Sequence, residues 1–197
     1  MYISRQLSTL FARLDISGNN VTPPNKKTVI TEDNQELPLN FRMWLDALFN
    51  GSSVLVHGLG TKRLILESFR QSQLSNSFVL VVNGLFVGLD IEDMLKSIAV
   101  EVLRIKQFPK ACDTYHLLAD EFNKRKNLHL YIIVHNIDGP ALKEGTKAHK
   151  LIEKLALNIR NVHLVASMDH ANATSCKFNI RDYYIDAISY IIFLMTW

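Results

Sequence analysis

The sequence has few cysteines and no apolar run long enough to cross a membrane, and each shortage excludes a class of protein. Its two cysteines, Cys112 and Cys176, form no CxxC pair, so neither a disulfide framework nor a zinc finger is expected and a reduced compartment fits. The uncharged stretch 187–197 is eleven residues long, whereas a membrane-spanning helix needs about 20. Arg5 and Arg13 interrupt the first apolar residues, which argues against a secretory signal. We therefore expect no membrane partner.

An excess of charge of one sign is also lacking. The 22 basic and 19 acidic residues leave a net charge of +3, which permits contact with nucleic acid without arguing for it. Three basic groups stand out, Lys62–Arg63, Lys124–Lys126 and Lys143–Lys150. Each is most simply a solvated helix surface, and a DNA-facing role is the alternative for any one of them.

The first 38 residues are predicted to be an N-terminal helix followed by a polar linker. Apolar residues between Ile3 and Leu14 share one helical face, which indicates a packing helix, with a transit peptide as the alternative. The segment from Gly18 to Pro38 is polar, contains three prolines and has no sustained period, which is typical of a linker or surface loop.

From residue 39 to 173 apolar runs alternate with helical patterns. The predicted strands are Ser53–His57, Phe78–Asn83, Leu128–Asn136 and Val162–Ser167. The predicted helices are Asn40–Phe49, Lys62–Leu74, Asp90–Gln107, Asp113–Lys126 and Thr146–Arg160. Continuous aliphatic strands are covered on both faces, and helices between them imply parallel pairing. The fold class is therefore α/β, a three-layer sandwich with a parallel sheet.

Sheets of this kind bind ligands beyond the carboxyl ends of their strands, and the first such end resembles a phosphate-binding loop. The glycines Gly58 and Gly60 are followed by Thr61, Lys62 and Arg63, which lead into a helix. A working loop, GxxxxGK[ST], has four residues between its glycines and a hydroxyl residue after the lysine. Here one residue separates the glycines and Arg63 follows the lysine. We therefore expect a tight turn and no nucleotide cofactor.

The third strand lacks the acidic pair of a nucleotide hydrolase, in which one carboxylate binds Mg²⁺ and another polarises water. His135 and Asn136 occupy those positions, and Asp138 comes two to three residues too late. Asp138 stands beside Gly139-Pro140, where an aspartate most commonly forms a turn. The sequence therefore predicts no catalytic residues.

A metal site is the rival hypothesis for the same strand ends, because imidazoles and carboxylates are good transition-metal ligands. None of the candidates has HxH or HExxH spacing, and histidines that hydrogen-bond around loop ends are the simpler interpretation. The candidates are His57, His135, Asp138, Asp169 and His170.

Four segments, in this order, resemble subunit 2 of the eukaryotic origin recognition complex. They are VLVHGLGTKR (54–63), VNGLFVG (82–88), IVHNID (133–138) and LVASMDHANA (164–173). The resemblance covers about residues 39 to 172. It implies a degenerate P-loop NTPase (AAA+-like) domain that has lost ATPase function and acts as a structural subunit.

The resemblance also implies where such a subunit works. It would lie in the nucleus, with the other origin recognition complex subunits as partners and with origin DNA contacted mainly through the complex. That assembly encircles origin DNA and supports loading of the replicative helicase. A nucleotide binder without hydrolysis and a small metallohydrolase are the alternatives.

Residues 174–197 depart from the family, so we interpret them as a divergent apolar tail. The winged-helix domain and the disordered N-terminal region of the family have no counterpart in this sequence, which suggests a truncated version. A complete fold of this class would pair a further strand beside Ser53–His57. We expect that the tail does not supply it, which would leave an unprotected edge.

Overall fold

A computed structural model describes residues 12–15, 37–57, 62–105, 111–168 and 182–186. The strands are β1 (Ala12–Asp15), β2 (Ser53–His57), β3 (Phe78–Asn83), β4 (Leu130–His135), β5 (Val162–Met168) and β6 (Asp182–Asp186). The helices are α1 (Leu37–Phe49), α2 (Arg63–Gln73), α3 (Ile91–Ser97), α4 (Ala111–Lys124) and α5 (Lys147–Asn158). A π-helical segment, η2 (Ile98–Val102), extends α3, and a 3-10 turn, η3 (Pro140–Leu142), precedes α5.

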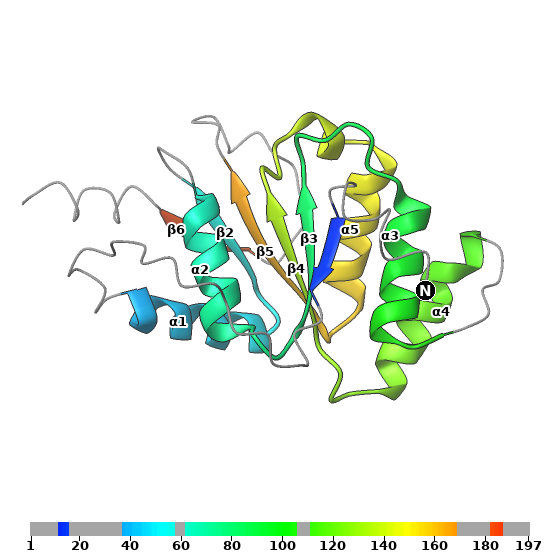
Figure 1. Ribbon diagram of the computed structural model, residues 1–197, viewed down its shortest axis with the longest axis horizontal. Coiled ribbons are helices and arrows are strands. Elements are labelled where there is room, and N and C mark those ends of the chain that lie inside the picture. The colour runs from blue at the N-terminus through cyan, green and yellow to red at the C-terminus, as the bar shows by residue number, and fades with distance from the viewer. Residues whose placement is uncertain (1–11, 16–36, 58–61, 106–110, 169–181, 187–197) are drawn as a thin grey trace, which may run out of the picture.

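The six described strands form one twisted sheet in the order β1-β3-β4-β5-β2-β6 (Figure 1). Every neighbouring pair from β3 to β6 is parallel, and β1 runs antiparallel to β3 at one edge. The four predicted strands of the central sheet are present and parallel, as expected. Their carboxyl ends therefore lie along one edge of the sheet.

Alternate strand residues face two separate cores, one on each side of the sheet. Val54 and Val56 pack with α1 and α2, whereas Leu55 packs with α3, α4 and α5. Figure 1 shows α1 and α2 on one side of the strands and α3, α4 and α5 on the other. Strands buried on both faces explain the continuous aliphatic runs, and the predicted three-layer α/β sandwich is confirmed.

The helix predicted to begin at Asp90 does so, but it ends early. The Asp90 carboxylate accepts from the backbone N–H groups of Glu92 (2.8 Å) and Asp93 (3.4 Å), which is an N-cap. Beyond Ser97 the helix widens into η2, and Arg104 adopts a positive φ of 59°. A left-handed residue ends a helix, so the helix predicted to run to Gln107 ends at Val102, and residues 106 and 107 lie outside the described ranges.

The N-terminal helix prediction is wrong at its end, because residues 12–15 form β1 and not helix. Backbone pairing with β3, in which Leu14 lies opposite Leu80, overrides the helical spacing of the apolar residues. Residues 3–11 lie outside the described ranges, as does most of the predicted linker.

The tail expectation is also wrong, because residues 182–186 supply the strand beside β2. In this parallel pair Ser53 lies opposite Asp182 and His57 opposite Asp186. The segment DYYID contains two tyrosines and an isoleucine, which favour strands, and β2 offers it a free ladder of backbone groups. Consequently β2 is an interior strand. None of the helices in the described part of the chain is long and apolar enough to cross a membrane.

Candidate functional site at the carboxyl edge of the sheet

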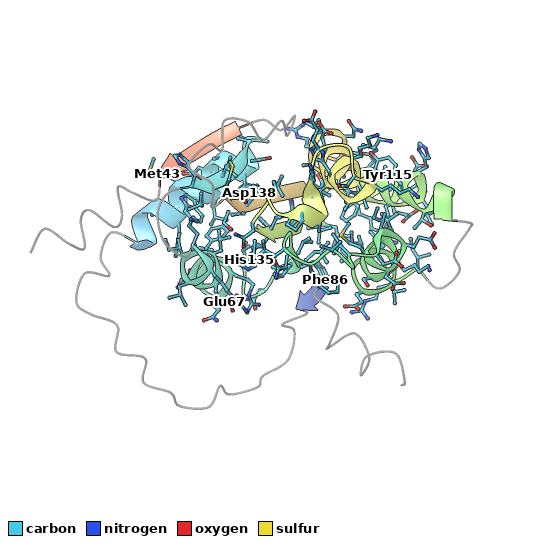
Figure 2. All side chains as sticks on the ribbon, turned by 90° about the horizontal axis from the view of Figure 1, so that it is seen from above. Met43, Glu67, Phe86, Tyr115, His135 and Asp138 are labelled. Carbon is cyan, nitrogen blue, oxygen red and sulfur yellow. The ribbon has the colours of Figure 1, made fainter. Side chains whose placement is uncertain are left out.

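The strand ends singled out from the sequence meet at one edge of the sheet. β3 and β4 end side by side at Asn83 and His135, and β2 and β5 end side by side at His57 and Met168. Figure 2 looks onto this edge from above and shows His135 near its centre. Any ligand of the sheet would therefore meet these four residues or the loops that follow them.

Only part of the phosphate-loop turn is described. Gly58, Gly60 and Thr61 lie outside the described ranges, whereas Lys62 and Arg63 begin α2. Lys62 takes the N-cap position without a side-chain cap hydrogen bond, and it is only 3% exposed. Arg63 is exposed. The lysine that would reach a phosphate is therefore withdrawn from solvent, and the neighbouring arginine presents its charge instead.

His135 stands where the first carboxylate of a hydrolase would be. Burial lowers the pKa of its imidazole, the nearby Arg63 lowers it further, and Glu67 partly opposes this. No described residue makes a hydrogen bond to its buried Nδ1. The lowered pKa favours the neutral imidazole, and neither the neutral nor the cationic form supplies the negative charge that Mg²⁺ requires.

Glu67 is the carboxylate whose charge acts on His135, and both of its oxygens already accept hydrogen bonds. The Arg70 guanidinium donates to both of its oxygens, at 2.6 and 2.9 Å, and the Gln71 amide donates at 2.7 Å. The hydrogen bonds from Arg70 hold the pKa of Glu67 below its usual value, despite partial burial. A carboxylate with a lowered pKa and three donors is a weak base, which makes it poorly suited to activating water.

Asn136 stands at the second carboxylate position, and its backbone groups make hydrogen bonds that hold the end of β4. It has a left-handed φ of 55°, and its N–H donates to the Ser167 hydroxyl of β5 at 3.0 Å. Its carbonyl accepts from Gly139 N–H at 2.9 Å, which closes a turn over Ile137 and Asp138. Ile137 N–H donates to the Ser167 carbonyl at 2.8 Å. Asp138 therefore lies in a turn, as predicted.

The ends of β3 and β4 interlock through two glycines. Gly84 N–H donates to the His135 carbonyl at 2.8 Å, and Ala141 N–H donates to the Gly84 carbonyl at 2.9 Å. A Cβ on Gly84 would lie 1.9 Å from the Asn136 carbonyl oxygen. A Cβ on Gly139 would lie 2.3 Å from the Gly84 carbonyl oxygen. Both positions thus exclude any side chain, and we call this contact the glycine interlock (Gly84, His135, Asn136 and Gly139).

The structure describes only part of the rival metal site. Asp169 and His170 lie outside the described ranges. Within those ranges, no three histidine, cysteine, aspartate or glutamate side chains come together in a way that could hold a metal ion. His57 ends β2, His135 ends β4 and Asp138 lies in the turn after β4, and these three do not form such a group.

Sequence reasoning missed a histidine pair at the opposite edge of the sheet. His163 Nδ1 lies 2.9 Å from the Leu48 carbonyl, and its Nε2 lies 2.9 Å from His129 Nδ1. Because a carbonyl only accepts, His163 donates through Nδ1 and accepts at Nε2 from His129. Burial lowers the pKa of His163 to about 4, helped by the adjacent His129 and opposed by the hydrogen bond to Leu48. No local sequence signal links these residues.

From the pair of His129 and His163 we predict that the stability of the chain depends on pH. The unfolded pKa of a histidine is about 6.5 and that of folded His163 is about 4, so the unfolded chain binds a proton first as pH falls. The stability that His163 contributes in its neutral form is complete above pH 6.5 and is lost as the pH falls from 6.5 to 4. The loss in the free energy of unfolding is about 3 kcal/mol in all. Denaturant unfolding at several pH values measures it. In His163→Asn, whose amide keeps a donor toward Leu48, that part of the pH dependence should vanish. An unchanged slope would contradict the assignment.

Comparison with known proteins decides the family. Residues 27–177 match the sequence model of the origin recognition complex subunit 2 RecA-like domain. Origin recognition complex subunit 2 of Homo sapiens is 33% identical over 151 residues, and that of Drosophila melanogaster is 40% identical over 147 residues. The chain belongs to the origin recognition complex subunit 2 family. The resemblance inferred from the four segments is therefore confirmed.

The family's solved structures share the fold. A chain in the structure of Drosophila ORC bound to DNA is 36% identical, with a TM-score of 0.66 over 77% of this chain and 89% of that one. Cdc6p of Pyrobaculum aerophilum, 14% identical with a TM-score of 0.54, covers 84% of this chain and 47% of that one, and shows the fold alone. The AAA+-like prediction is thus confirmed.

The origin recognition complex subunit 2 relatives are much longer than the matched region. The alignments cover 76% of this chain and 26% of the human protein, and 71% of this chain and 24% of the Drosophila protein. The chain thus spans about a quarter of their length. β6 begins after residue 177, where the family match ends, yet it completes the sheet beside β2.

Proposed function

We propose that this domain is a non-catalytic structural part of an origin recognition complex. It would act in the nucleus, with the other complex subunits as direct partners and origin DNA bound mainly through the assembly. The glycine interlock carries this proposal. It joins β3 and β4 through backbone hydrogen bonds, and β4 to β5 through the Ser167 hydroxyl, at the positions where a hydrolase holds its metal-binding and water-polarising carboxylates.

Three further features of the edge agree with a structural role. The buried Lys62 is withdrawn from the surface where a phosphate would approach. The lowered pKa of His135 favours its neutral form, and Glu67 is held by Arg70. Without a metal-binding carboxylate at the end of β4, neither Mg²⁺ nor an attacking water is positioned for phosphoryl transfer. The edge therefore supports docking and rigidity better than catalysis.

Family membership supports the choice of partners. The similar Drosophila chains come from structures of ORC bound to DNA, one of them together with Cdc6. By analogy, this domain would contact neighbouring subunits through a rigid sheet whose strand ends are tied together.

Co-purification tests the proposal. The full chain with an affinity tag is incubated in nuclear extract, and the bound proteins are identified by mass spectrometry. We expect the other origin recognition complex subunits to be enriched over a tagged unrelated domain of equal size. Recovery of none of those subunits, from an extract in which they are detectable and with a chain that melts cooperatively, would contradict the proposal.

A further inference from the structure

Four lysines follow one exposed side of α5 and the turn before it. Lys147, Lys150 and Lys154 have the spacing i, i+3 and i+7, which places their side chains on one side of α5, and Lys143 lies in the turn before the helix. All four are exposed. The opposite side of α5 is buried in the core through Ala148, Leu151, Ile152 and Leu155. We call the four residues the lysine face.

The lysine face carries uncompensated positive charge. Between residues 143 and 154, four lysines against two glutamates, Glu144 and Glu153, leave a net charge of +2. None of the four ammonium groups forms an ion pair with another described residue, whereas Lys96 on α3 lies 3.6 Å from Glu92. Ammonium groups without a carboxylate partner among the described residues attract an external anion.

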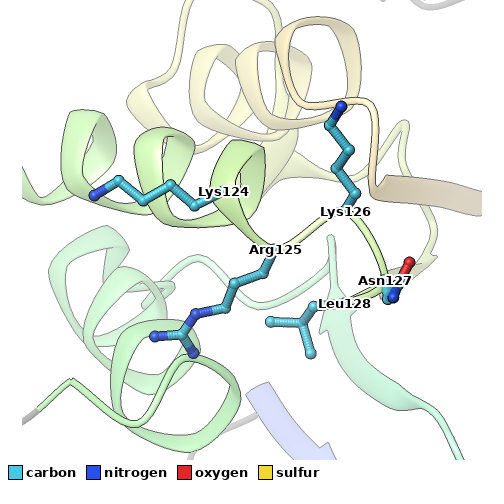
Figure 3. A pocket seen from close by; sticks show the side chains of 5 residues that line it. All are labelled: Lys124, Arg125, Lys126, Asn127 and Leu128. Atoms are coloured by element: carbon cyan, nitrogen blue, oxygen red, sulfur yellow. The ribbon is translucent and has the colours of Figure 1, made fainter.

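The other basic group of comparable size, Lys124–Lys126, is built differently. Lys124 and Arg125 both pair with Glu121, at 2.9 and 3.0 Å, and Arg125 also donates to the Leu103 carbonyl at 3.0 Å. Figure 3 shows Lys124, Arg125 and Lys126 pointing in different directions around an open groove of about 670 Å³. Two of these cations are therefore paired with a carboxylate of α4, and Arg125 also links the end of α4 to Leu103, which leaves the lysine face as the stronger basic surface.

We propose that the lysine face binds the phosphate backbone of duplex DNA without reading its sequence. From Lys147 to Lys154 the helix rises about 10 Å, at about 1.5 Å per residue. That length matches the rise of about three base pairs of duplex, each of which presents phosphates at about 3.4 Å per strand. Lysine ammoniums are compact point charges, which suit repeated phosphate contacts better than bidentate recognition of a single group.

The aromatic side chain beside the lysine face argues for duplex and against single-stranded nucleic acid. Single strands are held by stacking of bases on exposed aromatic rings. Here the Tyr115 ring lies under the Lys154 ammonium, 5.8 Å from its centroid. The Tyr115 hydroxyl donates to the Lys154 carbonyl at 3.3 Å and accepts from the Asn158 amide at 3.2 Å. The ring thus already lies against the Lys154 ammonium and its hydroxyl is hydrogen-bonded, and Figure 2 shows Tyr115 beside α5.

The salt dependence of DNA binding tests the proposal. Fluorescence anisotropy with a labelled 30-base-pair duplex of mixed sequence measures the affinity of the full chain between 50 and 200 mM salt. Each lost phosphate contact lowers the slope of log affinity against log salt by about 0.9. We expect the combined change Lys147→Gln, Lys150→Gln and Lys154→Gln to lower it by about 2 to 3 and to weaken binding at least about tenfold at 50 mM salt.

A charge-matched control separates the lysine face from net charge. The combined change Lys96→Gln, Lys124→Gln and Lys126→Gln removes the same three charges and should alter affinity less than about threefold. Arginine at positions 147, 150 and 154 should retain binding. Thermal melts confirm that each variant is folded, and Lys150→Gln alone should lower the slope by about 0.9.

Four results would overturn the proposal. They are no binding of the unchanged chain at 50 mM salt, equal losses in both glutamine triples, no effect of the lysine-face triple, and competition by a glutamate-rich peptide as strong as by unlabelled DNA. The last would mark the surface as a docking site for an acidic protein segment. The choice of DNA as ligand rests on the proposed role at origins, but the assay uses the isolated chain. Failure here would leave the co-purification of complex subunits unaffected.

Discussion

Replacing Gly84 with alanine is expected to lower the free energy of unfolding by about 3 to 5 kcal/mol, which is exceptional for the addition of one methyl group. The added Cβ would lie 1.9 Å from the Asn136 carbonyl oxygen, a backbone atom. Relief would require moving the ends of β3 and β4 apart, which breaks the hydrogen bonds of the glycine interlock. For a chain of this size the melting temperature should fall by about 10 °C, as thermal unfolding followed by circular dichroism would show.

Gly88→Ala is the matched control for this change. Its added Cβ would lie 2.9 Å from Phe86 Cζ, the far end of a half-buried side chain that can turn away. We expect a loss of about 1 kcal/mol or less. Equal stability of the two variants would contradict the interlock, and so would a Gly84→Ala chain that melts like the unchanged protein.

Ending the chain at residue 181 is expected to expose β2 and to destabilise the fold by about 3 kcal/mol or more. The truncation removes the five paired residues of β6, and each ladder hydrogen bond contributes about 0.5 to 1.5 kcal/mol. It also leaves β2 as an edge strand beside the buried core, which favours association between chains. Thermal melts and light scattering of chains 1–181 and 1–197 measure both effects.

A chain ending at residue 186 serves as the control, because it keeps β6 and removes only the residues after it. Its melting temperature should exceed that of chain 1–181 by several degrees. If chain 1–181 is monomeric and has the same melting temperature as chain 1–186, β6 does not contribute to the fold. The sequence-based expectation that the tail leaves β2 as an edge strand would then be restored.

The sequence predicted the central sheet because those strands are buried on both faces and carry continuous aliphatic runs. The edge strands were missed for a physical reason. β1 and β6 are defined by pairing with β3 and β2, far away in the chain, and local spacing contains no record of that pairing. The early end of the helix that begins at Asp90 was missed because nothing in the local pattern marks Arg104 as left-handed.

The sequence predicted the individual residues of the candidate site but not the contacts between them. Counting residues after β4 identified the absent carboxylates and placed Asp138 in a turn. The contact between Gly84 and Gly139 depends on the register of β3 against β4, which a single sequence does not define. The pairing of His129 with His163 has the same origin, since β4 and β5 bring the two residues together. Chemistry that depends on register becomes visible only in the folded chain.

Titration calorimetry of the full chain with ATP, with and without Mg²⁺, tests most directly the claim that this edge of the sheet is structural. We predict no saturable heat, corresponding to a dissociation constant weaker than about 1 mM. The reasons are the shortened phosphate-loop turn, the buried Lys62 and the absence of a metal-binding carboxylate at the end of β4. Micromolar binding that disappears in Lys62→Ala, in a variant whose melting temperature is unchanged, would contradict the account.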